Sequence, residues 1–257
     1  MALDAGHGVD TYPPNKGVPG LPEFAFNSAV VGMAKELAEH NGFKVVLVQP
    51  LNGKEVPLSH RVETANAEKV DLYLSTHADA SGNAGVRGHW SFYWGTSANS
   101  KKFAEIWKKN AKELLENPSR GIIGSQLNHW TNFYVLRATN MPANLSENGF
   151  MTNPLDKELL LSSAFRKNAA RAQIKTACEF FGLPFKDLHQ EKKEEQTLED
   201  RHEVITESLN VRNDVMGTII GKFKAGYKVD KLFDFDGTWW VVRRGELIGF
   251  VNSNFLK

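Results

Sequence analysis

The sequence predicts an α/β fold, with a mostly parallel twisted sheet flanked by helices on both faces, followed by a small all-β barrel. Three observations lead to this prediction. Short apolar, β-rich runs alternate with amphipathic helical patterns up to residue 182, which is typical of a parallel sheet covered by helices. A stretch dense in Lys, Glu, Asp and His follows at 186–203. After it come only short β-rich runs broken by turns.

The first part is expected to contain five helices and six strands. The first helix begins near Glu23, keeps its apolar residues on one face, and ends at Asn41-Gly42 as a C-cap. The other helices are expected at 58–68, 97–116, 154–161 and 164–181. Apolar or β-rich runs predict strands at 1–3, 43–48, 70–76, 88–94, 132–137 and 143–147.

The barrel is predicted from five β-rich runs, at 209–212, 218–221, 227–234, 239–243 and 247–251. Asp236-Gly237 between two of these runs is a hairpin signal. The charged stretch is expected to be a solvated linker or an exposed helix, so His189 and His202 within it are not expected to bind a ligand. The predicted domains are therefore 1–182 and 204–257, joined by a charged linker at 183–203.

Composition limits the classes of partner. The chain has 31 Lys and Arg against 30 Asp and Glu and no extended basic stripe, so a nucleic acid partner is not expected. No apolar run is long enough to span a bilayer, so no membrane partner is expected, and no signal peptide is visible. The single cysteine, Cys178, excludes an internal disulfide and lies in an apolar helical run, which predicts a buried thiol.

Two histidines are expected at one edge of the predicted sheet. His7 follows the first strand in a glycine-rich turn, and His77 follows the strand at 70–76. Ligands bind at the carboxyl ends of the strands in open α/β sheets. Glu23 falls on the apolar face of the first helix, where a carboxylate is costly unless it is paired or bound to a metal. Two histidines and one carboxylate match a catalytic zinc site, which keeps a fourth position for water.

Glu147 ends the strand expected at 143–147, and a carboxylate there can take a proton from water and return it to a leaving amine. Structural roles stay open for all of these residues. The histidines are alternatively loop or core residues, and Glu23 is alternatively a first-turn acid that complements the helix dipole. Glu147 is alternatively a salt-bridge partner of Arg61 or Arg137.

Aromatic residues are candidates for contact with a substrate. His89-Trp90 and His129-Trp130 are expected either to line a sugar or peptide groove or to pack in the core and rim. Near the C-terminus, the residues expected either to form a shallow aromatic groove or to fill the barrel core are Tyr227, Phe235, Trp239 and Trp240.

Five motifs occur in the order and approximate spacing of one known family. They are Asp4-Ala5-Gly6-His7-Gly8, Glu23 at a helix start, Leu58-Ser59-His60-Arg61-Val62-Glu63-Thr64-Ala65-Asn66, Ser75-Thr76-His77-Ala78-Asp79 and Glu147-Asn148-Gly149-Phe150-Met151-Thr152-Asn153. Over residues 2–182 the chain resembles zinc-dependent N-acetylmuramoyl-L-alanine amidases of the amidase-3 type. It departs from their pattern in its short first strand, in the polar Ser146 before Glu147 and in Asn148 after it.

The resemblance implies an enzyme, a substrate and a site. The substrate it implies is peptidoglycan, cut at the amide between the lactyl group of N-acetylmuramic acid and L-alanine. It implies one zinc ion per catalytic domain and makes Glu147 the catalytic carboxylate. Arg61 and Asn66 match family positions near the core of the site and are implied to be supporting residues. The implied zinc ligands are His7, Glu23 and His77.

Residues 204–257 resemble a bacterial SH3-like (SH3b) module, a class that often binds cell-wall peptides. The resemblance is carried by Leu209-Asn210-Val211-Arg212, Trp239-Trp240-Val241-Val242 and Gly249-Phe250-Val251. Together the two resemblances imply a wall hydrolase, either a phage endolysin or a bacterial autolysin. A monomer is expected, and because no signal peptide is visible, the protein is expected to be made in the cytoplasm and to act on the cell wall. The alternatives are a zinc peptidase that cuts within the stem peptide and a wall-binding protein with a catalytically inert amidase fold.

Overall fold

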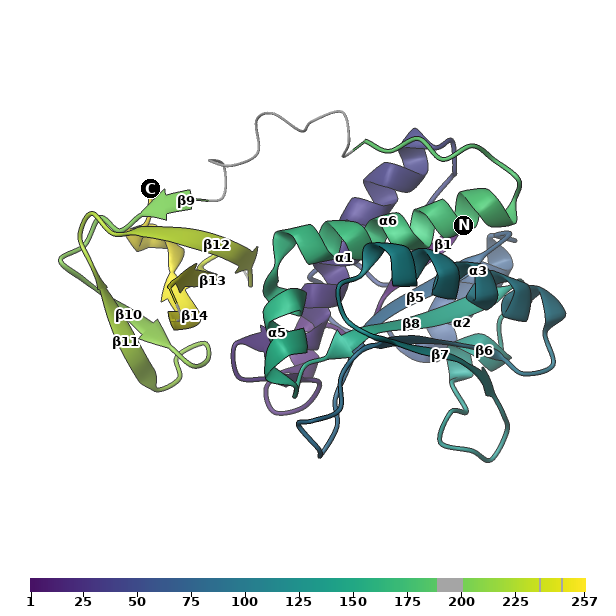
Figure 1. Cartoon of the computed structure of the whole chain (residues 1–257), viewed down its shortest axis with the longest axis horizontal. Coiled ribbons are helices and arrows are strands. Elements are labelled where there is room, and N and C mark those ends of the chain that lie inside the picture. The colour runs from purple at the N-terminus through teal and green to yellow at the C-terminus, as the bar shows by residue number, and fades with distance from the viewer. Residues whose placement is uncertain (189–200, 236, 246) are drawn as a thin grey trace.

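Figure 1 shows the computed structural model, which describes residues 1–188, 201–235, 237–245 and 247–257. The N-terminal part is built on a six-stranded sheet with the strand order β4-β1-β5-β8-β6-β7. All neighbouring pairs in it are parallel except β6 with β8, so the predicted mostly parallel sheet is confirmed. In that order, the strands are Val46–Leu47, Ala2–Ala5, Tyr73–Asp79, Ala143–Phe150, His89–Trp94 and Ser119–Ser125.

Helices cover both faces of this sheet, as predicted. One face shares a hydrophobic core with α1 (Glu23–His40), α3 (Ala98–Leu114) and α6 (Ser163–Phe180). The other face shares a second core with α2 (Leu58–Ala67) and α4 (Tyr134–Arg137). α5 (Pro154–Leu161) leads from β8 into α6, where Cys178 is buried as expected. Between β1 and α1 lie a 3-10 helix (Val9–Thr11) and the short strands β2 (Gly17–Val18) and β3 (Leu21–Pro22).

Strand alternation decides which side chains face each helix layer. Along β5, Leu74 lies in the core beneath α1 and α6, whereas Tyr73 lies in the core on the α2 side. Successive side chains of a strand point to opposite faces, so His77 shares the face of Tyr73. By the same alternation, Glu147 of β8 shares the face of Leu145, which lies in the α2-side core. His77 and Glu147 therefore project from the same face of the sheet.

The C-terminal part is a second six-stranded sheet, antiparallel throughout, with the order β11-β10-β14-β13-β12-β9. In that order, the strands are Ile219–Lys224, Ser208–Arg212, Leu247–Asn252, Trp239–Arg244, Lys228–Asp234 and Arg201–Glu203. All five predicted runs form strands. The sixth strand, β9, comes from the end of the charged stretch. Residues 189–200, with His189, and the hairpin residue Asp236 lie outside the described residues.

The C-terminal sheet packs directly on the first turn of α1. The ring of Phe24 meets the ring of Phe235 edge to face, with centroids 5.4 Å apart. Tyr12, in the segment between β1 and α1, donates its hydroxyl to Asp214 at 3.0 Å. The core beneath α1 consequently continues into β12, β13 and β14, a contact that the sequence does not predict.

A buried arginine also joins the two parts. Arg166 of α6 is 2% exposed, and its guanidinium donates to the backbone oxygens of Leu160 and Leu161 at the end of α5. It donates a further hydrogen bond, of 2.6 Å, to the backbone oxygen of Leu232 in β12. One side chain therefore satisfies carbonyl groups from both parts of the chain.

The four C-terminal aromatic residues do not share one groove. Phe235 and Trp239 pack against the core that contains α1, whereas Tyr227 and Trp240 pack against the small core of the C-terminal sheet. The Trp240 ring also meets His202 of β9, with centroids 4.6 Å apart. These aromatic side chains therefore pack in two separate hydrophobic cores.

The structure differs from the expected strands in three places. Residues 132–137 form a turn and α4 instead of a strand, and Val135 and Leu136 are buried there, so this apolar run reflects packing in the α2-side core and not strand pairing. β7 is missed by the sequence analysis because it contains Gly121 and Gly124 and few apolar residues, so it lacks the pattern of a buried strand. It is a partly exposed strand at the edge of the sheet. The strand expected at 43–48 is reduced to the two residues of β4 at the opposite edge.

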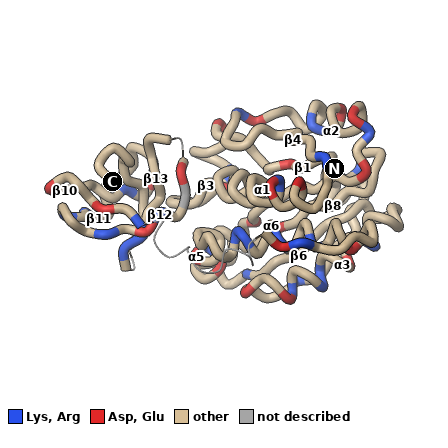
Figure 2. Tube along the Cα trace, turned by 90° about the horizontal axis from the view of Figure 1, so that it is seen from above, with Lys and Arg blue, Asp and Glu red and all other residues tan. Residues whose placement is uncertain are grey.

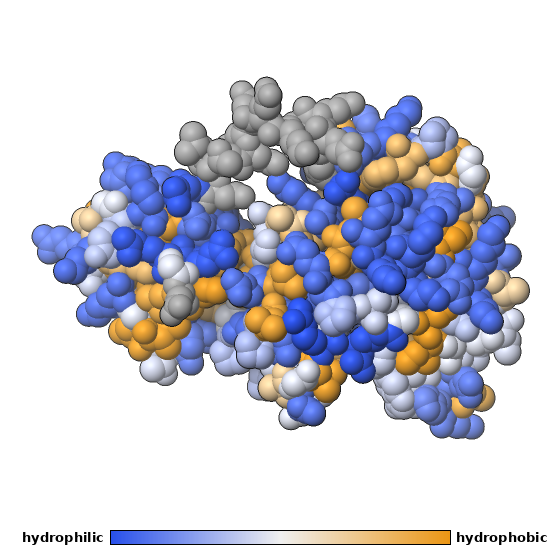
Figure 3. Space-filling model, viewed as in Figure 1, coloured by the Kyte–Doolittle hydropathy of each residue, from blue (hydrophilic) through white to orange (hydrophobic). Residues whose placement is uncertain are grey.

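The surface carries both signs of charge. Figure 2 shows Lys and Arg interspersed with Asp and Glu over both parts of the chain. On the face drawn in Figure 3, hydrophilic residues predominate and hydrophobic residues form separate patches. Among the described residues, no helix combines the length and the apolar character needed to cross a membrane.

Candidate metal centre and catalytic cavity

The turn after β1 places His7 beside His77. His7 has a left-handed backbone conformation, with φ 65°, which costs a residue other than glycine about 1 kcal/mol or more. Gly6 before it has no side chain, and a Cβ there would lie 2.2 Å from His77 Cε1. Only glycine therefore allows the turn to approach β5 this closely. The two imidazole rings meet edge to face with centroids 5.2 Å apart.

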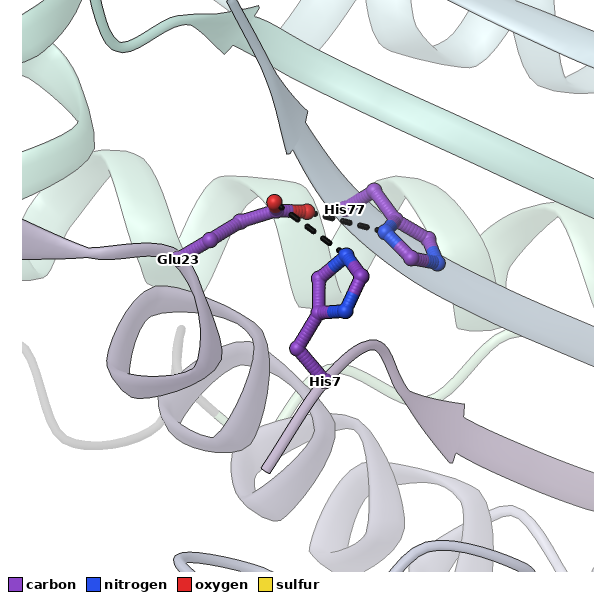
Figure 4. A group of neighbouring side chains, drawn as sticks. All are labelled: His7, Glu23 and His77. Atoms are coloured by element: carbon purple, nitrogen blue, oxygen red, sulfur yellow. Dashed lines mark hydrogen bonds and ion pairs between the residues drawn. The ribbon is translucent and has the colours of Figure 1, made fainter. Parts of the chain in front are cut away.

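Glu23, the first residue of α1, directs its carboxylate at both histidines (Figure 4). Its Oε1 is 2.8 Å from His77 Nδ1, and its Oε2 is 3.3 Å from His7 Nε2. The carboxylate is 5% exposed. One potential ligand atom from each of the three residues lies within 4.8 Å of the others, which makes this the candidate metal site among the described residues. The predicted convergence of His7, Glu23 and His77 thus appears in the structure.

The three side chains fit a zinc ion by their chemistry. Two imidazole nitrogens and one carboxylate oxygen form a ligand set found in catalytic zinc sites. Burial lowers the pKa of His7, which favours the neutral imidazole that can bind a metal. Burial alone would favour neutral Glu23, but the hydrogen bond with His77 and the charge of His7 lower its pKa overall. The carboxylate form, also the metal-binding form, is therefore favoured.

Each histidine is held through the ring nitrogen that points away from Glu23. His7 Nδ1 lies 3.2 Å from Glu55 Oε1, and His77 Nε2 lies 3.1 Å from Ser75 Oγ. Metal-binding histidines are typically oriented by such a partner on the second nitrogen. The structure therefore leaves His7 Nε2 and His77 Nδ1 directed at the shared site.

Arg61, a predicted supporting residue, lies behind both histidines. Its guanidinium is 1% exposed, 2.9 Å from Asp4 Oδ1 and 3.4 Å from Glu55 Oε1. Asp4 in turn accepts a hydrogen bond of 2.8 Å from Ser75, the partner of His77. Arg61 therefore acts on the histidines indirectly. It binds Glu55, the partner of His7, and through Asp4 it holds Ser75, the partner of His77.

Asn66, the second predicted supporting residue, lies elsewhere. It donates to the backbone oxygen of Ala138 at 3.1 Å and accepts from the backbone nitrogen of Asn140 at 2.9 Å. These bonds anchor the loop that follows α4. Neither of them reaches the three-residue cluster.

Glu147 lies beside the cluster, in register with His77 on the neighbouring strand. It falls inside β8 and not at its end, and its Oε2 is buried without a hydrogen-bond partner among the described residues. Burial, together with the charges of Asp79 and Glu23, raises the pKa of its carboxyl well above the usual range. The described residues show no ion pair of Glu147 with Arg61 or Arg137, so the salt-bridge alternative finds no support.

These residues share one cavity of about 520 Å³. His7, Glu23, His77 and Glu147 all line it. His7 follows β1, Glu23 begins α1, and His77 and Glu147 lie in the carboxyl-terminal halves of β5 and β8. A carboxyl group whose Oε2 has no hydrogen-bond partner in the described part of the chain, next to two imidazoles and a carboxylate, is suited to proton transfer in a hydrolytic reaction.

Sequence reasoning missed several residues that hold this site. Asn27 donates to Glu23 Oε1 at 3.3 Å and to the backbone oxygen of Gly6 at 2.8 Å; its position one helical turn after Glu23 could have indicated it. Asn148, noted only as a departure from the family pattern, donates to the backbone oxygen of His77 at 3.0 Å. Glu55 lies in a loop and gives no sequence signal.

The fold is that of a class of cell-wall hydrolases. Residues 1–178 match the family model for N-acetylmuramoyl-L-alanine amidase, and the chain belongs to this amidase-3 family. The family match ends before the C-terminal sheet, which it does not describe.

Known relatives agree with this family. CwlM of Bacillus licheniformis, named N-acetylmuramoyl-L-alanine amidase, is 32% identical over 70% of this chain and 68% of its own length. AmiC of Neisseria meningitidis is 27% identical over 67% of this chain, which spans only half of AmiC. The catalytic domain of CwlV from Bacillus (Paenibacillus) polymyxa has a TM-score of 0.63 and 27% identity, covering 71% of this chain and 98% of that domain.

Proposed function

We propose that this protein is a zinc-dependent N-acetylmuramoyl-L-alanine amidase. It hydrolyses the amide between the lactyl group of N-acetylmuramic acid and the L-alanine of the peptidoglycan stem peptide. The observation that carries the proposal is the cluster of His7, Glu23 and His77 beside the buried Glu147 in one cavity. Membership of the amidase-3 family supports the same reaction.

The residues that would hold zinc are His7, Glu23 and His77. A zinc ion there would supply Lewis-acid polarisation of the scissile carbonyl. Glu55 and Ser75 fix the two imidazole rings, and Arg61 holds Glu55 in place and, through Asp4, Ser75. The ligand atoms therefore need little reorganisation to bind the metal.

Glu147 performs the proton transfers. Its carboxylate takes a proton from the attacking water, and the resulting carboxylic acid gives that proton to the leaving nitrogen of L-alanine as the C–N bond breaks. The raised pKa of its carboxyl suits a group that must hold the proton between these two steps. Among the described residues, Oε2 has no hydrogen-bond partner that would have to be displaced.

Product analysis on purified cell walls tests the reaction. The amidase releases peptides with a new L-alanine amino terminus and leaves muramic acid intact. A peptidase would instead create a new carboxylate within the stem peptide, and an inert wall-binding protein would release no peptide. A chelator should stop the release and zinc should restore it; full activity of a metal-free sample would exclude zinc dependence.

We further propose that 204–257 forms an SH3-like wall-binding domain, joined by the linker at 183–203 to a catalytic domain at 1–182. The antiparallel sheet and the SH3b-like motifs support this assignment. A fluorescent protein fused to residues 201–257 should co-sediment with purified walls, whereas the unfused fluorescent protein should stay in solution. The setting we propose is wall lysis by a monomeric enzyme, as a phage endolysin or a bacterial autolysin.

A further inference from the structure

The two ends of the cavity differ in chemistry. The strand order arranges the site from His7 on β1, through His77 on β5 and Glu147 on β8, to Trp90 on β6. At the β6 end the lining residues are Phe92, Trp130, Phe133 and Tyr134. At the β1 end the lining includes His7, Glu23 and Lys16, and among the described residues Lys16 is the one lysine or arginine that lines the cavity. Aromatic rings and a lysine thus lie on opposite sides of Glu147.

Trp130 forms an exposed, fixed aromatic surface at the β6 end. Its side chain is 63% exposed, and its ring contacts Trp90 and Phe92 with centroids 6.0 Å and 5.8 Å away. The loop that carries it is held by a hydrogen bond of 2.9 Å between His129 Nδ1 and the buried Thr131 Oγ1. A large exposed ring in the lining of the cavity offers a flat apolar surface to a ligand.

Lys16 supplies positive charge at the β1 end. Its backbone oxygen accepts from the backbone nitrogen of Glu23, which fixes it next to the first turn of α1. Its side chain is exposed, and it has no ion-pair partner in the part of the chain that the structure describes. A carboxylate bound at this end would meet the Lys16 ammonium group without displacing an ion-pair partner among the described residues.

We propose that the substrate crosses the sheet in one direction, with the sugar of N-acetylmuramic acid stacked on Trp130 and a stem-peptide carboxylate directed at Lys16. This inference rests on the proposed function. The scissile amide joins a pyranose, whose faces present C–H groups that pack on an aromatic ring, to a peptide that carries free carboxylates. The aromatic rings at the β6 end match the sugar, and Lys16 at the β1 end matches a carboxylate of the peptide.

The orientation of the substrate is tested by calorimetry on the full chain, which measures the affinity for the sugar half and the peptide half separately and needs no turnover. The probes are the disaccharide of N-acetylglucosamine and N-acetylmuramic acid with its lactyl group as an amide, the free stem peptide, and that peptide with its carboxylates amidated. Trp130→Ala should weaken disaccharide binding about tenfold and leave peptide binding unchanged. Lys16→Gln should weaken binding of the free peptide about two- to fivefold, and less at high salt, without affecting the other two probes.

Two control variants separate these effects from general damage. Leu127→Ala removes another exposed apolar side chain from the Trp130 loop, and Lys101→Gln removes an exposed lysine of α3; neither residue lines the cavity. Both should bind all three probes as the wild type does. Disaccharide binding that survives Trp130→Ala, or an exchange of the two effects between the variants, would overturn the proposal. A wild type that binds the probes in this pattern but cuts no wall would refute the reaction and leave the orientation standing.

Discussion

Replacing Glu147 by glutamine separates proton transfer from metal binding. Glu147→Gln keeps the size of the side chain but cannot accept a proton, and general acid–base catalysis contributes about 10² to 10⁴-fold to a rate. We therefore expect kcat for release of L-alanine amino termini to fall by that factor, which is about 3 to 5 kcal/mol of activation free energy. Zinc content should remain one per chain because no residue of the cluster is changed.

The same substitution should not lower stability at pH 7. The pKa of Glu147 is raised in the folded protein, so its ionisation disfavours folding increasingly as pH rises above about 4.3, the ordinary value for glutamate. Glutamine carries no such charge, and Tm of the variant at pH 7 should equal or exceed that of the wild type. At pH 4 this difference should vanish.

The matched control is Glu23→Gln, which removes a carboxylate from the cluster itself. It should reduce zinc content and activity together, because it converts a charged oxygen ligand into a neutral amide. Metal analysis, calorimetry and amino-terminus release on the two variants give the comparison. If Glu147→Gln releases the zinc, Glu147 binds the metal; if it retains near-full activity with zinc bound, the proton acceptor is another residue.

Three further predictions follow from particular contacts. Gly6→Ala places a Cβ against the His77 ring and should lower zinc content, as measured by metal analysis, whereas the exposed Gly82 has no neighbour within 4 Å of such a Cβ and offers Gly82→Ala as the comparison. Arg166→Met leaves the carbonyls of Leu160, Leu161 and Leu232 without their donor and should lower the free energy of unfolding in urea by about 3 kcal/mol or more, against about 1 kcal/mol or less for Lys35→Met in the exposed pair with Glu39. Burial lowers the pKa of His89, so the unfolded chain takes up its proton first as pH falls below about 6.5; Tm should fall through this range, and the fall should be smaller in His89→Gln.

The convergence of His7, Glu23 and His77 could be predicted because it follows from local rules. His7 and His77 each follow a short apolar run, and parallel strands end at a common edge, so residues 70 positions apart are expected side by side. The position of Glu23 on the apolar face of a helix predicts that its carboxylate is paired or bound there. The same rules failed for residues 132–137, where apolar side chains are buried in a turn and a short helix.

The supporting contacts could not be predicted in the same way. Arg61 meets Asp4, and Glu55 meets His7, across stretches of chain that carry no periodic signal. Asn66 matched a family position, yet its side chain holds the loop after α4, because a position in a motif does not determine which neighbour a side chain contacts. The sequence likewise left Trp130 open between groove and core, since its exposure depends on the path of one loop.

The packing of Phe24 on Phe235 limits which other C-terminal domains could replace the one in this protein. A foreign wall-binding module attached at the linker would remove the ring next to Phe24, the acceptor of the Tyr12 hydroxyl and the Leu232 carbonyl bound by Arg166. In such a chimera the contact between the two parts, here called the seam, would include Phe24. Phe24 directly follows Glu23, so the seam lies one residue from the proposed metal ligand. An engineer who exchanges the C-terminal part must therefore transplant its contact surface as well, and in natural lineages the residues on the two sides of this seam are expected to change together.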